Sequence, residues 1–136
     1  MQPLTVPGEL GALSAIGQYV MSAASEAGLD KATAYRLRLS VDEIATNIIV
    51  HGYDEAGLTG NVVIRAEIDG DGLRLFLEDT AIPYDPLQQA PPAGMDQPLE
   101  EREIGGLGVY LAIQSVDEFR YERVDDHNRN VFVMRR

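Results

Sequence analysis

A glutamate and an asparagine four residues apart, Glu43 and Asn47, are the first residues whose types and spacing point to chemistry. On a helix, side chains with this spacing lean the same way, one turn above the other. A carboxylate and an amide together supply hydrogen-bond acceptors, an amide donor and a negative charge. Because an apolar stripe runs beside them, the pair predicts the wall of a pocket; a solvated helix face is the alternative.

Asp79 is a second candidate. It follows a leucine-rich segment that alternates like a strand, and it opens the segment 79–86 (Asp-Thr-Ala-Ile-Pro-Tyr-Asp-Pro). An acidic residue at the end of a strand, where the chain turns, is well placed to bind a ligand by hydrogen bonds. The alternative is an aspartate that only initiates the turn.

A glycine cluster, Gly105, Gly106, Leu107 and Gly108, is the third candidate. Glycines let the backbone approach an anion closely, and the N-terminus of the helix that follows offers free N–H groups and a favourable dipole. A flexible hinge is the alternative. Neither a Gly-x-x-x-x-Gly-Lys-Ser/Thr loop nor an early Gly-x-Gly-x-x-Gly is present, so a bound nucleotide would require another architecture.

The elements that position these residues follow from periodicity. A helix at about 30–51 carries a core-facing stripe at i, i+4, i+7 and i+11, and a tight turn at 69–72 joins two alternating strands. The order strand, helix, helix, strand, strand, long loop, helix, strand, strand predicts an α+β sandwich with helices on one face of a mixed sheet. The expected helices are 9–27, 30–51 and 109–116, and the expected strands are 4–6, 62–68, 73–78, 118–124 and 131–134. The stripe of the second helix is Leu37, Val41, Ile44 and Ile48, and its polar side is Arg36, Ser40, Glu43, Asn47 and His51.

Composition narrows the class of protein. A chain of 136 residues predicts one domain, and the absence of cysteine excludes disulfides, thiolate zinc sites and a thiol nucleophile. The formal charge of −11 argues against direct binding to nucleic acid or to an anionic membrane surface. No segment approaches the roughly 20 apolar residues that span a bilayer, and no signal peptide is evident. We expect a soluble cytoplasmic protein.

Taken together, the three candidates resemble the ATP-binding fold that gyrase, sensor histidine kinases and mismatch-repair ATPases share (GHKL). Glu43 and Asn47 match its N-box, Asp79 its first glycine box, and the cluster 105–108 its second. Within this superfamily the chain is similar to the anti-sigma factor serine kinases of the RsbW and SpoIIAB type. The segments that carry this closer resemblance are 42–47 (Asp-Glu-Ile-Ala-Thr-Asn), 83–86 (Pro-Tyr-Asp-Pro), 104–111 (Ile-Gly-Gly-Leu-Gly-Val-Tyr-Leu) and 130–134 (Asn-Val-Phe-Val-Met).

The resemblance implies a Bergerat-type two-layer α/β sandwich. Its sheet would be mixed and mainly antiparallel, helices would cover one face, and residues 1–136 would form one domain with a long ATP lid at about 80–104. It also implies roles. Asn47 would coordinate Mg²⁺ through its amide oxygen, Glu43 would accept the proton of an attacking serine hydroxyl or water, and Asp79 would bind the adenine amino group. The glycines would let the lid pack on the phosphates. The expected nucleotide-binding residues are Asn47, Asp79, Ala81, Arg102, Gly105, Gly106, Leu107 and Gly108.

Two of these positions carry alternatives. Arg102 is a candidate contact for the terminal phosphate or for a partner protein, and a solvated charge is the equal alternative. Ala81 stands where the family commonly has glycine. If the backbone there requires a positive φ, alanine costs about 1 kcal/mol, and either adenine binding is weaker or the loop takes a slightly different position.

The function that the resemblance implies is an ATP-dependent protein serine kinase and anti-sigma factor. It would phosphorylate an anti-anti-sigma (STAS-type) protein and sequester a sigma factor. A catalytically weak ATP/ADP switch that acts by partner exchange is the alternative. A detached sensor kinase domain is disfavoured because no dimerisation helices or phosphoacceptor histidine helix precede it. The family also implies a homodimer, with the exposed side of the first helix or the leading strand as the interface.

Overall fold

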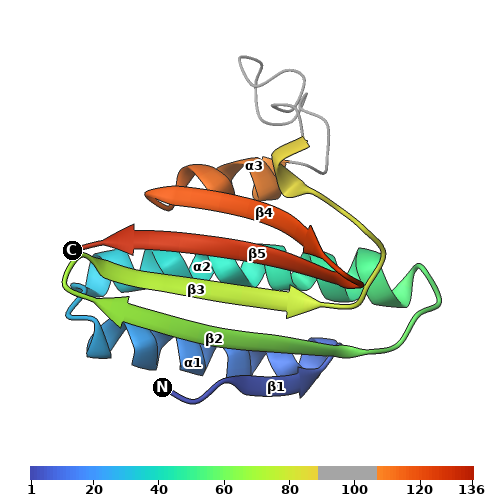
Figure 1. Cartoon of the computed structure of the whole chain (residues 1–136), viewed down its shortest axis with the longest axis horizontal. Helices are drawn as coiled ribbons and strands as arrows, with labels where there is room; N and C mark the ends of the chain where they lie inside the picture. Colours follow the sequence, from blue (N-terminus) through green and yellow to red (C-terminus); the bar gives the residue numbers. More distant parts are fainter. Residues whose placement is uncertain (89–106) are drawn as a thin grey trace.

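The computed structural model describes residues 1–88 and 107–136, and in it helices cover one face of a five-stranded sheet (Figure 1). The strands lie in the order β1-β2-β3-β5-β4. Their bounds are β1 Leu4–Pro7, β2 Asn61–Asp69, β3 Gly72–Asp79, β4 Glu118–Val124 and β5 His127–Arg135. The helices are α1 Leu13–Glu26, α2 Lys31–Asn47 and α3 Leu107–Gln114, with short helical segments η1 Leu10–Ala12, η2 Ile48–Asp54 and η3 Pro86–Gln88. The α+β sandwich predicted from the sequence is confirmed.

One feature of the expected sheet is corrected. All four neighbouring strand pairs of the described residues are antiparallel, so the sheet is not mixed. Two of the pairs, β2–β3 and β4–β5, are hairpins with two residues between the strands, and such a short connection allows only antiparallel pairing. The last strand, β5, inserts between β3 and β4 and is longer than the expected 131–134, because its pairing with β3 begins opposite Asp79.

The predicted apolar stripe of α2 is buried against the sheet. Leu37, Val41 and Ile44 are each at most 1% exposed, and alternate residues of β3 are buried in the same hydrophobic core. Asp30 caps the helix by accepting a hydrogen bond from the Thr33 N–H at 2.7 Å, which confirms the predicted start.

The predicted end of that helix is wrong. The chain does not stop near Gly52 but continues from Asn47 into η2, a π-helical segment that ends at Asp54. Gly52 is needed for a close approach instead, since a Cβ there would lie 2.8 Å from the Ala81 methyl group. The π-helical segment, which continues the helix that carries Glu43 and Asn47, therefore packs through Gly52 against the turn that follows β3.

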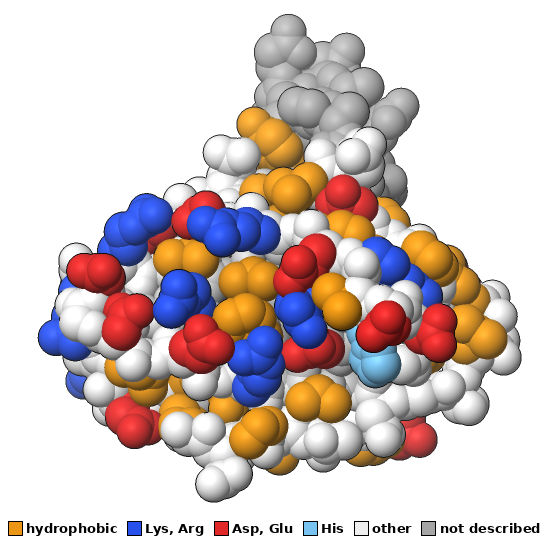
Figure 2. All heavy atoms as spheres, in the orientation of Figure 1, with side chains coloured by type: hydrophobic (Ala, Val, Ile, Leu, Met, Phe, Trp, Pro, Cys, Tyr) orange, Lys and Arg blue, Asp and Glu red, His pale blue; other side chains and the backbone are white. Residues whose placement is uncertain are grey.

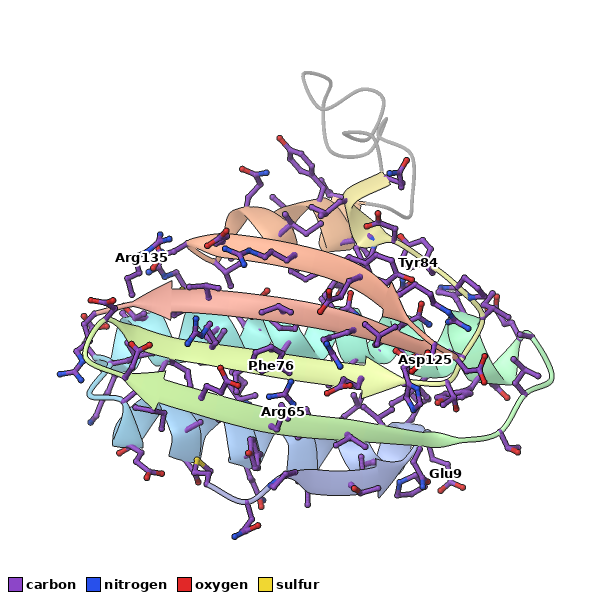
Figure 3. All side chains as sticks on the ribbon, viewed as in Figure 1. Glu9, Arg65, Phe76, Tyr84, Asp125 and Arg135 are labelled. Atoms are coloured by element: carbon purple, nitrogen blue, oxygen red, sulfur yellow. The ribbon has the colours of Figure 1, made fainter. Side chains whose placement is uncertain are left out.

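The face of the sheet opposite the helices carries interspersed arginines and carboxylates (Figure 2). The Glu78 carboxylate forms a salt bridge with Arg65 at 3.1 Å, and it lies 3.4 Å from the Arg129 guanidinium. Arg129 forms a second salt bridge, with Glu122, at 2.9 Å. The Arg65 guanidinium also stacks 3.7 Å above the Phe76 ring centre (Figure 3). These arginines are already paired within the chain.

No helix within 1–88 or 107–136 has the length and apolar character needed to cross a membrane.

Candidate functional site

Glu43 lies directly against the N-terminal part of α3. A Cβ added to Gly108 would stand 2.6 Å from the Glu43 carboxyl carbon, a distance that no real Cβ tolerates. Gly108 is therefore the residue that lets α3 approach the carboxylate. The structure thus brings together two predicted site residues that are 65 positions apart in the chain (108 − 43). Leu107 is the first described residue of α3, whereas Arg102, Gly105 and Gly106 lie outside the described residues.

Ser40 fixes the position of α3 on α2. Its hydroxyl is 1% exposed and donates a hydrogen bond to the Ala112 carbonyl at 2.8 Å. That carbonyl belongs to the last turn of α3, where helical carbonyls lack partners within the helix. Ser40 was expected on the polar side of α2; it is a buried link between two helices, one turn before Glu43.

A cavity of about 270 Å³ opens between α2, η2, the end of β3 and β5. Three predicted residues line it: Asn47, Asp79 and Ala81. Isoleucines from α2 and η2 and Ile82 from the turn supply apolar walls. Glu43 and Gly108 do not line this cavity, although the neighbouring Val109 does. The predicted residues therefore fall into a pocket group and a group at the α2–α3 contact.

Asp79 is the buried polar centre of the cavity, at 2% exposure. Its Oδ1 accepts hydrogen bonds from the Ala81 N–H and the Asn128 amide, both at 2.9 Å. Its Oδ2 is buried and has no hydrogen-bond partner. Burial raises the pKa of Asp79 above its usual range, while the bonds from Asn128 and Ala81 act against that rise. An unpaired buried carboxylate oxygen is costly, so this atom is ready to accept a hydrogen bond from a ligand.

Asn128 was not identified from the sequence. Its amide donates to Asp79 Oδ1 and to the Ile82 carbonyl at 3.0 Å, and it also contacts the Ala81 carbonyl at 3.3 Å. Its Oδ1 accepts hydrogen bonds from the Tyr121 hydroxyl and from the Tyr84 N–H. A single side chain of β5 thus holds the whole turn that leaves β3.

Asn130 was also missed as a site residue. It is 2% exposed, lines the cavity, and has a buried Oδ1 without a partner. A signal was present in the sequence: Asn128 and Asn130 occupy the inward positions of β5 that Phe132 and Met134 continue. Polar residues on the buried side of an alternating strand indicate a site.

Ala81 does not carry the backbone strain that a positive φ would impose on alanine. Among the described non-glycine residues only Asp125, in the β4–β5 turn, has a positive φ. Ala81 is 3% exposed and its methyl group packs against Gly52. Alanine in place of the family's usual glycine is thus matched by a glycine on the opposite wall.

Tyr84 lies in the segment after β3, on the side of the molecule where the β4–β5 turn carries Asp125 (Figure 3). Burial raises the pKa of Tyr84, and a hydrogen bond with the Asn47 side chain opposes the rise. The amide oxygen of Asn47 is the atom that a cation would require.

No group of three or more His, Cys, Asp or Glu side chains within 1–88 and 107–136 is arranged to hold a metal ion. The donors present do suit one kind of cation. Mg²⁺ is commonly held by one or two protein oxygens together with substrate phosphates and water. The amide oxygen of Asn47 fits that pattern, with phosphate oxygens as the further ligands.

Comparison with known proteins identifies the family of the chain. The histidine kinase-like ATPase domain family matches residues 6–136. The chain is similar to the serine-protein kinase RsbW of Bacillus licheniformis, with 30% identity over 89 residues, and of Bacillus subtilis strain 168, with 32% over 89 residues. Each alignment covers 63% of this chain and 55% of the relative, so the chain spans about half the length of the curated relatives it matches. Because the family match extends over nearly the whole sequence, this chain belongs to the histidine kinase-like ATPase family.

Proposed function

We propose that this protein binds ATP and is an ATP-dependent protein serine kinase and anti-sigma regulatory factor. It phosphorylates an anti-anti-sigma partner and sequesters a sigma factor. The observation that carries the proposal is the unpaired, buried Oδ2 of Asp79 in an otherwise largely apolar cavity. Adenine carries an exocyclic amine that donates to such an oxygen, and its flat ring suits walls made of isoleucine.

The spacing along α2 and η2 fits a nucleoside triphosphate. Ala81, beside Asp79, contacts Gly52, so the base lies at that level of the helix. Asn47 precedes Gly52 by five residues and Glu43 precedes it by nine, so the two side chains lie at successive turns further back along the same helical path. With the base on Asp79, the phosphates extend past Asn47 towards Glu43 and the N-terminal part of α3.

Each group then has a task. Asn47 would hold Mg²⁺ through its amide oxygen, and the ion would supply neutralisation of the negative charge that develops during phosphoryl transfer. The carboxylate of Glu43 accepts the proton of the attacking hydroxyl as the new oxygen–phosphorus bond forms. The bond between the γ-phosphorus and the oxygen that joins it to the β-phosphorus breaks, and its electron pair leaves with ADP. Gly108 keeps the backbone of α3 close enough to hold that carboxylate in place.

The surface around Glu43 favours a protein as the acceptor. Leu39, one turn before Glu43, is 51% exposed, and Leu111, one turn after Gly108, is 49% exposed. The Ser40–Ala112 hydrogen bond brings their two helices together at these neighbours. Apolar side chains on both sides of a carboxylate suit a folded protein partner better than a water-only hydrolase site.

The alternative is an ATP/ADP switch that exchanges partners without phosphorylating them. The position of Glu43 favours the kinase over this switch, because the residue lies outside the cavity and contributes nothing to base binding. If Glu43 serves only to order magnesium-bound water, the protein is an ATP/ADP switch and not a kinase.

The test begins with calorimetry of ATP and Mg²⁺ on the purified chain. The protein is then used to recover partners from the native cytoplasm with and without ATP, and phosphosites are mapped on what is recovered. Glu43→Gln should abolish phosphotransfer and leave ATP affinity within about threefold, since it removes a base and no binding contact. Asp42→Asn, the neighbouring exposed acid, is the matched control and should behave as wild type. Full phosphotransfer by Glu43→Gln would exclude the base assignment, and ATP binding without any phosphoserine would establish the switch.

A further inference from the structure

Tyr53 is the largest fully buried side chain of the described residues, at 1% exposure, yet it does not line the nucleotide cavity. It lines a second cavity of about 380 Å³ together with Ile49 and Val50. The segment η2 therefore stands between two cavities, with His51 and Gly52 on the first and Tyr53 on the second. A π-helical turn in this position frequently marks a functional site.

The hydroxyl of Tyr53 uses its full hydrogen-bonding capacity. It donates to the Asn61 carbonyl at 2.7 Å and accepts the Thr80 backbone N–H at 2.8 Å. The Thr80 hydroxyl lies 3.1 Å away. A phenol has one donor and two acceptor positions, and its one hydrogen is directed at Asn61. The Thr80 hydroxyl is therefore the donor in the third bond, and Thr80 is held twice by one atom.

Glycines enclose the Tyr53 ring. A Cβ on Gly8 would lie 2.6 Å from its Cδ2 and a Cβ on Gly60 would lie 2.8 Å from its Cε1. These two glycines are themselves joined by a hydrogen bond of 2.8 Å from the Gly8 N–H to the Gly60 carbonyl. The ring cannot move towards Gly8 or Gly60 without displacing these segments, so the two glycines fix the position of its hydroxyl on these sides.

Thr80 lies between Asp79 and Ala81, the two residues of the turn that face the base. Asn128 holds this turn from β5, and Tyr53 holds it from η2. We infer that Tyr53 is a positioning residue for base selection: through the Thr80 N–H it sets the direction in which Asp79 presents its unpaired oxygen. This inference rests on the proposed function only in taking adenine as the group that Asp79 meets.

Tyr53→Phe tests it, because the variant keeps the ring in its slot and removes only the hydroxyl. Tyr35→Phe, the same loss of a hydroxyl at an exposed position of α2, is the matched control. Affinities for ATP and for inosine triphosphate, which carries a carbonyl in place of the amine, are measured by calorimetry. The ratio between them should fall about tenfold in Tyr53→Phe and stay within about twofold in Tyr35→Phe, as expected for a lost hydrogen bond that aims a carboxylate. A loss of folded protein alone lowers the stoichiometry and leaves the ratio unchanged, and that result overturns the inference.

A second readout needs no nucleotide. The Ala81 N–H, which binds Asp79 Oδ1, reports the order of the turn by hydrogen exchange. In Tyr53→Phe its exchange should accelerate relative to core amides of β3; equal acceleration of both overturns the inference. If the wild type binds no ATP, the proposed function fails while this readout still decides the role of Tyr53.

Gly60→Ala perturbs the surroundings of the same ring without changing Tyr53, and it replaces Tyr53→Phe as the test variant if Tyr53→Phe does not fold. Its new Cβ would lie 2.7 Å from the Thr80 hydroxyl oxygen and 2.8 Å from Cε1 of the Tyr53 ring, so it presses on both partners of the contact, whereas Gly70→Ala, where nothing lies within 4 Å, is the matched control. Gly60→Ala should accelerate the exchange of the Ala81 amide and Gly70→Ala should not. Identical exchange in the two variants contradicts the inference.

Discussion

Replacing Asp79 with asparagine tests the base-binding site at its centre, because the structure fixes how the new amide would lie. Oδ1 of Asp79 accepts from two donors, the Ala81 N–H and the Asn128 amide. The amide oxygen of the variant must take that position, since an NH₂ group there would oppose both donors. Its NH₂ group is then directed at the place of the unpaired Oδ2, so the cavity presents a donor where it had an acceptor.

The magnitude follows from this exchange. A hydrogen bond to a charged acceptor contributes about 1.5–3 kcal/mol, and the variant also opposes the adenine amine with a second donor. ATP affinity should therefore fall at least about 100-fold, which corresponds to about 2.7 kcal/mol. Inosine triphosphate, whose carbonyl accepts a hydrogen bond, should bind the variant better than ATP does. Calorimetry with both nucleotides measures the reversal, and a variant that keeps the wild-type preference for ATP would refute the reasoning.

The same substitution should stabilise the protein without nucleotide. Because burial raises the pKa of Asp79, the folded state binds this proton more tightly than the unfolded state does. The free energy of unfolding therefore falls as pH rises from the unfolded pKa of about 3.9 through the folded pKa, and the cost is complete above it. Asp79→Asn lacks this cost. The free energy of unfolding of Asp79→Asn, measured by urea denaturation, should exceed that of the wild type most near neutral pH, and the difference should shrink as the pH approaches 4. An advantage that is equal at both pH values would show that the ionised carboxylate is not the source.

Three further substitutions test the contacts around the site. Gly108→Ala should lower phosphotransfer about 100-fold with a much smaller effect on ATP affinity, because the new methyl group displaces the Glu43 carboxylate; steady-state kinetics and calorimetry separate the two. Asn128→Ala should lower the free energy of unfolding by about 2–3 kcal/mol, since several buried groups lose their partner; urea denaturation measures the loss, and a change below about 0.5 kcal/mol contradicts the bridging role. Ser40→Ala should cost about 1 kcal/mol of stability through the α2–α3 link, while ATP affinity stays within about twofold.

The order and type of the elements were determined by the sequence itself. Helical periodicity placed the stripe of α2 against the sheet, and the turn at 69–72 defined the β2–β3 hairpin, because both depend on neighbours within one or two turns of chain. The same local signals located Glu43, Asn47 and Asp79. Asp79 ends a strand, and that position is readable without any contact between distant segments.

Only the tertiary structure decided what those residues meet. Asn128 reaches Asp79 across 49 positions of sequence and Ser40 reaches Ala112 across 72, and no local pattern encodes such pairings. The backbone at Ala81 has no positive φ, and its methyl group has room because Gly52 lacks a side chain, which is a property of two segments in contact. Burial, the raised pKa of Asp79 and the slot around Tyr53 arise from the same cause. A polar group's environment is set by chain that folds over it from far away, and periodicity reports only which face it occupies.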